Sequence, residues 1–282
     1  MHRLTYDCRC VLVPALALTF LASSGCGVLW SRTVPMPPEP LKVLVAQVTL
    51  KAPVTSPTDL HSFNDAPPPE IQPMLLAQLI DEVQVHAQRA FIEELSRQQA
   101  FQPVPFQEAR LMLSDMPFTG EELSEAALAI LGDRVGADIV VPGRILDYGA
   151  IQWQYWVSGL ALSMLTETLV VGAATGFNPA IMAATAASEL VTDLPFWWGG
   201  AYVGGWAFRP VRIKAEAIQI TGCQKRIWTE QELVFLVPGK TLAKYPPEER
   251  QRKEVQLEVN LQHALTNLAD AAGRELRLQP CT

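Results

Sequence analysis

The sequence predicts an α/β (α+β) fold in which helices cover a mixed sheet and one apolar insertion interrupts it. Three observations carry this prediction. Apolar runs of strand length alternate with amphipathic stretches of helical period in the first half of the chain. A β-hairpin pattern and a long amphipathic helix come last. Between these parts, residues 145–208 hold five of the seven tryptophans, four acidic residues and no lysine or arginine.

Residues 1–25 have the pattern of a secretory signal peptide. Two arginines precede an apolar run over 11–21, which is too short to span a membrane as a helix, and small residues follow. The ending Ser-Ser-Gly-Cys resembles a bacterial lipobox, although its first position is usually leucine, so we expect Cys26 to be acylated. A plain signal peptidase site is the alternative. Gly27, where aspartate would oppose export, favours the outer membrane.

The chain behind this cysteine divides into a tether, a domain and an insertion. Four prolines between positions 35 and 40 make residues 26–40 an extended tether. The predicted periplasmic domain comprises residues 41–150 and 209–282, and the insertion comprises residues 151–208.

Export also determines the cysteine chemistry. Two of the five cysteines leave with the signal peptide and Cys26 carries lipid. Cys223 and Cys281 remain in an oxidising compartment, and we expect a disulfide between them. Two free thiols are the alternative.

The first half of the domain reads as strand, helix, strand, helix, strand. Residues 41–50 are apolar on both faces, as in a central strand, and residues 70–99 follow a loop with the period of an amphipathic helix. The prolines in 101–106 allow at best an edge strand. Thr119, with glutamate three residues on, predicts the start of a helix that Gly136 ends. A strand over 137–148 follows.

The second half reads as a hairpin and a helix. Residues 211–220 alternate, with Val211, Ile213, Ala215 and Ala217 inward and Arg212, Lys214 and Glu216 outward, and residues 225–236 return beside them. Residues 246–278 predict a long C-terminal helix with one apolar stripe. The stripe comprises Leu257, Leu261, Leu265, Leu268, Ala272 and Leu276.

The insertion predicts a helical hairpin of residues 156–176 and 179–190. It has three interpretations: it contacts a membrane, it lies between subunits of an oligomer, or it packs on the sheet as extra core. Glu167 argues against a lipid-facing span, because a carboxylate at mid-bilayer is costly, unless it faces a partner helix. The residues expected to contact membrane or partner are Glu167 and the flanking tryptophans Trp153, Trp156, Trp197, Trp198 and Trp206.

Composition and motifs exclude several classes of function. A net charge of −7 without a basic cluster disfavours nucleic-acid binding. The four histidines have no metal-ligand spacing, and no nucleotide or hydrolase motif is present. We therefore expect a protein without catalytic residues, metal or cofactor. An enzyme would need a polar pocket near Asp147 or His86.

The order of segments in this chain resembles that of a known family. It runs from an acylated cysteine and a proline-rich tether to the strand LKVLVAQV, a long helix, and then GADIVVPGR ahead of a hairpin and a C-terminal helix. This pattern resembles the periplasmic α/β domain of CsgG-type lipoproteins and of the TolB N-terminal domain. The resemblance covers about residues 41–147 and 210–278. It implies a non-enzymatic envelope protein, and Cys26 with Gly27 predicts its place on the periplasmic face of the outer membrane. The insertion lacks the alternation of a pore strand.

Together these observations predict a binding or assembly module of an envelope complex. Its partners would be the membrane, through the lipid anchor, and other envelope proteins or further copies of itself. The alternative is an oligomeric subunit of an outer-membrane secretion or export channel.

Overall fold

A computed structural model describes residues 39–114, 124–149, 153–198, 202–203, 206–222, 224–237 and 239–280. Every described residue belongs to one compact unit, Pro37–Thr282. The signal peptide, most of the tether and the three cysteines Cys26, Cys223 and Cys281 lie outside the described residues.

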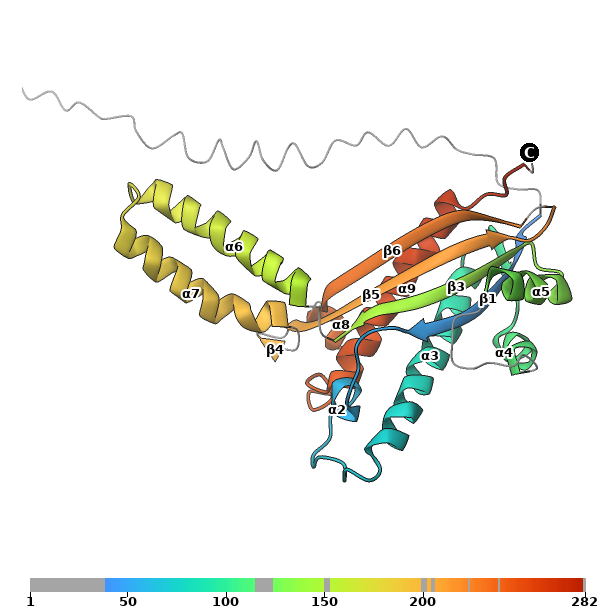
Figure 1. The fold of residues 1–282 in the computed structure, drawn as a ribbon, viewed down its shortest axis with the longest axis horizontal. Helices are drawn as coiled ribbons and strands as arrows, with labels where there is room; N and C mark the ends of the chain where they lie inside the picture. Colours follow the sequence, from blue (N-terminus) through green and yellow to red (C-terminus); the bar gives the residue numbers. More distant parts are fainter. Residues whose placement is uncertain are drawn as a thin grey trace, which may run out of the picture. The chain divides into compact units, whose positions relative to one another are not determined.

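The described part of the chain contains a six-stranded mixed sheet, which confirms the predicted α/β class (Figure 1). Its strand order is β2-β1-β3-β5-β4, and β6 pairs with β5. Strand β1 is parallel to both of its neighbours, whereas β5 is antiparallel to β3, β4 and β6. The strands are β1 (Leu41–Leu50), β2 (Phe101–Pro103), β3 (Ile139–Tyr148), β4 (Tyr202–Val203), β5 (Trp206–Gln219) and β6 (Lys225–Val237).

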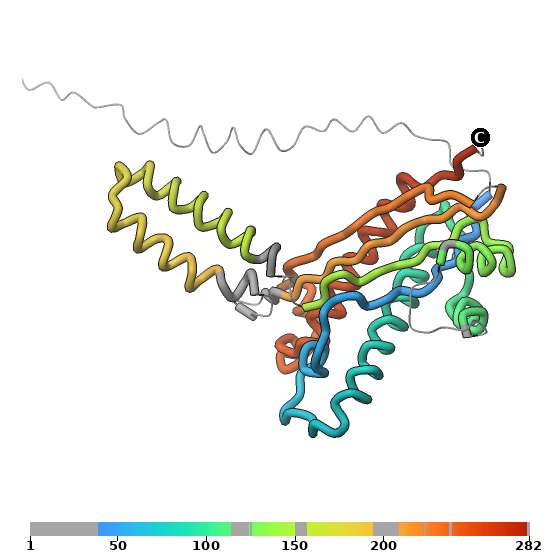
Figure 2. Tube along the Cα trace, viewed as in Figure 1, coloured from blue at the N-terminus to red at the C-terminus, as the bar shows by residue number. Residues whose placement is uncertain are grey.

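Two long helices, α3 (Gln72–Ser96) and α9 (Lys253–Glu275), cover one face of the sheet (Figure 2). The larger core lies between them and the inward residues of β1, β3 and β5. All six predicted stripe residues of the C-terminal helix are buried in this core, and so are the four predicted inward residues of β5. The helix starts seven residues later than predicted, because residues 246–252 form turns.

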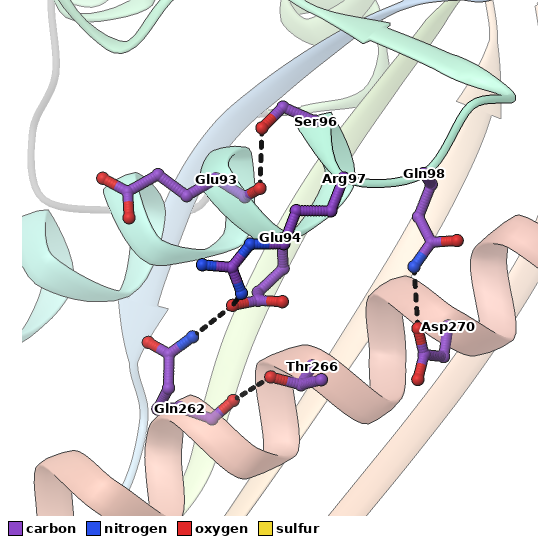
Figure 3. Close-up of polar contacts among 8 residues, drawn as sticks. All are labelled: Glu93, Glu94, Ser96, Arg97, Gln98, Gln262, Thr266 and Asp270. Carbon is purple, nitrogen blue, oxygen red and sulfur yellow. Dashed lines mark hydrogen bonds and ion pairs between the residues drawn. The ribbon is translucent and has the colours of Figure 1, made fainter.

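Polar side chains join the two long helices where α3 ends. Glu94, although buried, accepts a hydrogen bond from Nε2 of Gln262 at 2.6 Å and is paired with Arg97. Nearby, Nε2 of Gln98 donates to Oδ1 of Asp270 at 2.7 Å (Figure 3). These contacts satisfy a carboxylate that burial would otherwise penalise.

The opposite face of the sheet carries α4 (Phe106–Ser114) and α5 (Glu125–Val135) over a smaller core. Helix α4 is not predicted from the sequence. Helix α5 begins after Ser124, whose Oγ accepts from the backbone N–H of Ala127 at 3.2 Å, rather than at Thr119, which lies outside the described residues. The short helices α2 (Pro57–Leu60) and α8 (Gly239–Leu242) complete the domain.

The insertion consists of helices α6 (Trp153–Ala174) and α7 (Pro179–Trp198), placed in the chain between β3 and β5. Both helices are longer than predicted: α6 starts three residues earlier and α7 continues eight residues past Leu190. In the part of α7 beyond the predicted end, the hydroxyl of Thr192 donates to the carbonyl of Ser188 at 3.1 Å.

Candidate functional site

Helices α6 and α7 lie side by side, and each of them contacts the other more than it contacts any other element (Figure 1). The turn between them is closed by its own backbone. Gly176 and Phe177 have φ angles of 65° and 56°, and the N–H of Phe177 donates to the carbonyl of Gly172 at 2.6 Å. Oδ1 of Asn178 accepts from the N–H of Ala180 at 3.0 Å, which caps the start of α7.

The outer faces of this hairpin are apolar and exposed. In the described part of the chain, one helix has the length and composition of a membrane span: α6, over Val157–Ala174, with only 11% of that window buried. Helix α7 likewise exposes Val191, at 75%. The low burial is contrary to the interpretation of the insertion as extra core. The exposed large side chains are Val157, Leu162, Leu165, Leu169, Val170, Phe177, Ile181, Leu190 and Val191.

The inner face is the polar one. Ser163 of α6 donates its hydroxyl to Oδ2 of Asp193 in α7 at 3.0 Å. Glu189 is 5% exposed, and neither of its carboxylate oxygens accepts a hydrogen bond from a donor in the described residues. The carboxyl of Glu167 lies within its hydrogen-bonding reach, and the charge of Asp193 is close enough to repel it. The hairpin therefore buries one carboxyl while many of its large apolar side chains are exposed, which is unusual for a protein in water.

Several hydroxyl groups of the hairpin donate to the preceding helical turn, whereas the buried Oγ1 of Thr168 has no hydrogen-bond partner among the described residues. Thr166 donates to the carbonyl of Leu162 at 2.8 Å, and Thr175 donates to that of Val171 at 2.8 Å. A hydroxyl bonded back to the preceding turn presents less polarity to its surroundings. These contacts make the outer surface more apolar than the sequence alone indicates.

The predicted contact residues fall at different places in this arrangement. Glu167 is exposed at the middle of α6. Of the tryptophans, Trp153 and Trp156 lie in the first turns of α6, Trp197 and Trp198 in the last turn of α7, and Trp206 at the start of β5. The backbone places four of them at the end of the hairpin that joins the sheet. Their side chains lie outside the described part of the structure.

The junction between sheet and insertion is held by contacts that the sequence did not reveal. Nε of Arg212 lies 2.7 Å from Oδ2 of the buried Asp147, and the N–H of Gly149 donates to the carbonyl of Pro210 at 2.8 Å. Arg209 donates from Nε to Oε1 of Gln256 at 3.1 Å. Burial raises the pKa of the Asp147 carboxyl, and the charge and hydrogen bond of Arg212 offset part of that rise. Both ends of the insertion are therefore fixed to the domain.

A second charged cluster lies on the outward face of β3, β5 and β6. Glu216 is surrounded by Nζ of Lys214 at 2.8 Å, Nη1 of Arg144 at 3.5 Å and Nε of Arg226 at 3.4 Å. Burial alone would raise the pKa of Glu216, but the hydrogen bond from Lys214 and the three positive charges outweigh it and lower that pKa. The alternation on β5 predicted Lys214 and Glu216 on this face, but not the contribution of Arg144 from β3 and Arg226 from β6.

We expect Glu216→Gln to destabilise the domain by about 1–3 kcal/mol at pH 7, because it removes charge-assisted hydrogen bonds to a buried group. The folded-state pKa of Glu216 is below the ordinary value of 4.5, so its contribution is present above pH 4.5 and is lost as the pH falls below it. Urea unfolding of both proteins from pH 7 to pH 3 should show the difference shrinking towards acid. A difference that stays constant over this range would contradict the assignment.

A cavity of about 150 Å³ lies near His86 and Tyr148. Nε2 of His61 is 3.4 Å from Oε1 of Glu254, and Nε2 of His86 is 3.9 Å from Oε1 of Glu258. A polar pocket is thus present where an enzyme would need one. Its described lining contains no serine, threonine, cysteine or lysine, and no group of three or more metal-binding side chains is found among the described residues. Burial raises the pKa of the Tyr148 phenol, which keeps its proton.

Fold and site together define a mixed-sheet α/β protein with an apolar helical hairpin inserted between two sheet strands. No family model and no curated protein sequence matches the chain. Among solved structures, the C-terminal domain of LpoB from Salmonella enterica matches with 8% identity over 70% of this chain and 84% of that one, at a TM-score of 0.29. The lipoprotein GNA1162 from Neisseria meningitidis matches with 11% identity over 69% and 82%, at 0.32. At these TM-scores the likenesses determine neither fold nor function.

The CsgG-type and TolB-like resemblance is not among these matches, and it stays a prediction. The disulfide between Cys223 and Cys281 also stays a prediction. Described residues near both cysteines in sequence do meet: the side chain of Gln219 accepts from the N–H of Gln279 at 2.8 Å and donates to its carbonyl at 3.1 Å.

Proposed function

We propose that this chain is a non-enzymatic lipoprotein of the bacterial envelope, anchored through Cys26 to the periplasmic face of the outer membrane. Its α/β domain acts as a binding or assembly module, and the α6–α7 hairpin is the part that contacts a membrane or partner subunits. The lipid anchor at Cys26, the outer-membrane location and the contact surface on the hairpin are all part of this proposal.

One observation carries it: the hairpin exposes large apolar side chains on both helices, while the carboxyl of Glu189 is buried between them and that of Glu167 stays exposed. Water would penalise that arrangement twice, since apolar area stays exposed and a buried carboxyl lacks a donor. Apolar surroundings relieve the first penalty. An exposed apolar patch of this kind marks a surface for a membrane or a partner.

Replacing residues 151–208 with a short linker is expected to make the protein easier to extract with detergent or to reduce the size of its native assembly. The replacement also removes β4 and the first three residues of β5. Neither sheet core contains a described residue of 151–208, so the domain should remain folded. Detergent titration of membranes and size measurement of the extracted protein are the readouts. Circular dichroism of the shortened protein is the control. Unchanged extraction together with unchanged size would contradict the proposal.

A subunit of a secretion or export channel is the second candidate. The observation that favours it is a row of small exposed residues on α7 at four-residue spacing, Ala180, Ala184 and Ser188. Small residues at this spacing let helices approach closely inside a membrane. A channel subunit should migrate as a large, detergent-stable ring, whereas a binding module should not.

A further inference from the structure

We propose that the occupant of the exposed hairpin surface is the hydrocarbon of a lipid bilayer, into which α6 and α7 insert together, turn first. This inference rests on the proposed function. That function left open whether the hairpin contacts a membrane or partner subunits, and the inference names lipid. It is carried by the length of the helices, the treatment of their polar groups and the distribution of charge.

The lengths match a bilayer. Helix α6 has 22 residues and α7 has 20, which corresponds to about 33 Å and about 30 Å at 1.5 Å per residue. The hydrocarbon layer of a bilayer is about 30 Å thick. Because both helices reach the same turn, the Gly176–Asn178 segment would lie near the far interface when the sheet end of the hairpin lies at the near one.

The polar groups are arranged as lipid requires. Backbone groups in hydrocarbon must be satisfied internally, and the turn meets this through the Phe177–Gly172 bond and the Asn178 cap. Thr166 and Thr175 donate to carbonyls of their own helix. Glu189 is buried between the two helices with Glu167 as its neighbour. Glu167 itself is exposed at the middle of α6 and is a costly group to place in lipid.

The absence of basic residues, the low burial of α6 and the tryptophan positions bear on which occupant fits the hairpin. Residues 145–208 contain no lysine or arginine, so attraction to anionic headgroups cannot supply the binding. In a soluble protein a helix as apolar as α6 is usually a buried core helix, but only 11% of its apolar window is buried. A signal sequence can also be this apolar, but α6 lies in the middle of the chain. The tryptophan positions at the sheet end of the hairpin suit a bilayer interface.

The test uses the full-length protein reconstituted into vesicles of phosphatidylethanolamine and phosphatidylglycerol that contain a phospholipid with a photoactivatable carbene precursor deep in one acyl chain. We expect labels on the outer residues of α6 and α7. Leu165→Arg places a charge at the middle of the span, at a side chain already 58% exposed. It should lower the ratio of inserted to uninserted hairpin by about a hundredfold, the penalty for arginine at a helix centre.

Met74→Arg is the matched control, because Met74 of α3 is also exposed, at 70%, and lies outside the hairpin. It should leave labelling unchanged. Amide hydrogen exchange of 157–191 in vesicles and in detergent-free buffer gives a readout without substitution, and should slow in vesicles while α9 stays the same. Labelling should also persist at high salt and in vesicles of phosphatidylcholine alone.

Two results would overturn the inference: no label within 157–191 in the unmodified protein, or equal labelling in the Leu165→Arg variant. If removal of 151–208 still changed the assembly size in that case, a partner protein would be the occupant and the proposed function would stand. If labelling occurred but the removal changed neither extraction nor size, insertion would stand and the assembly role would fail.

Discussion

Asp147→Ala is expected to lower the free energy of unfolding of the domain by about 3–5 kcal/mol. Asp147 is 1% exposed, and its substitution leaves Arg212, which is itself mostly buried, without the carboxylate 2.7 Å from its Nε. Removing one partner of a buried ion pair costs more than the pair itself stabilises. Urea unfolding followed by circular dichroism measures the loss.

The double variant Asp147→Leu and Arg212→Leu should recover most of that loss, because no charge then remains buried. Burial is the largest influence on the pKa of the Asp147 carboxyl and raises it, which supports this expectation. Glu93→Ala, at an exposed position of α3, should change stability by less than about 0.5 kcal/mol. A single variant as mild as this control would mean that solvent reaches the pair.

Gln88→Leu is expected to cost roughly 2–6 kcal/mol, since two backbone acceptors lose a buried donor at about 1–3 kcal/mol each. The register between β1 and β3 shifts between Val45 and Val48. Nε2 of the buried Gln88 donates to the carbonyls of Val45 at 3.1 Å and Ala46 at 2.6 Å. Leucine fills a similar volume but donates to neither.

Gln78→Leu is the control for this substitution. Gln78 lies on the exposed side of the same helix and bonds only Glu82, at 2.8 Å, among the contacts described for its side chain. We expect a change of about 0.5 kcal/mol or less. Equal effects of the two substitutions in thermal or urea unfolding would show that the irregularity in β1 does not depend on Gln88.

Local patterns predicted much of the fold. The run of apolar residues over 41–50 is β1, with the same bounds, and the alternation from Val211 onwards is the inner face of β5. Gly136 ends α5 with a φ of 61°, and Gly222 occupies the β5–β6 turn with a φ of 81°. Each of these features depends on neighbours within about ten residues, and this is why the sequence shows it.

Features that depend on distant partners were missed. Thr119 and the glutamate three residues on predicted the start of α5, but the side chain of Ser124 supplies its cap. Helix α4 follows Pro105 directly, where prolines suggested an extended segment; its first turn bonds the carbonyl of that proline. The burial of Glu189 could not be predicted, because only the packing of α6 against α7 decides which side of each helix is inside.

The bond from the N–H of Gly149 to the carbonyl of Pro210 has an evolutionary consequence. It brings the departing and returning chain so close that an ancestor with an ordinary tight turn between β3 and β5 would have needed no other change to gain the hairpin. Insertions succeed where they leave the surrounding backbone pairing intact. A different segment should fit between Gly149 and Pro210. The sheet of this protein should therefore be kept in homologous domains with unrelated segments at this site, and in chimaeras built to carry one.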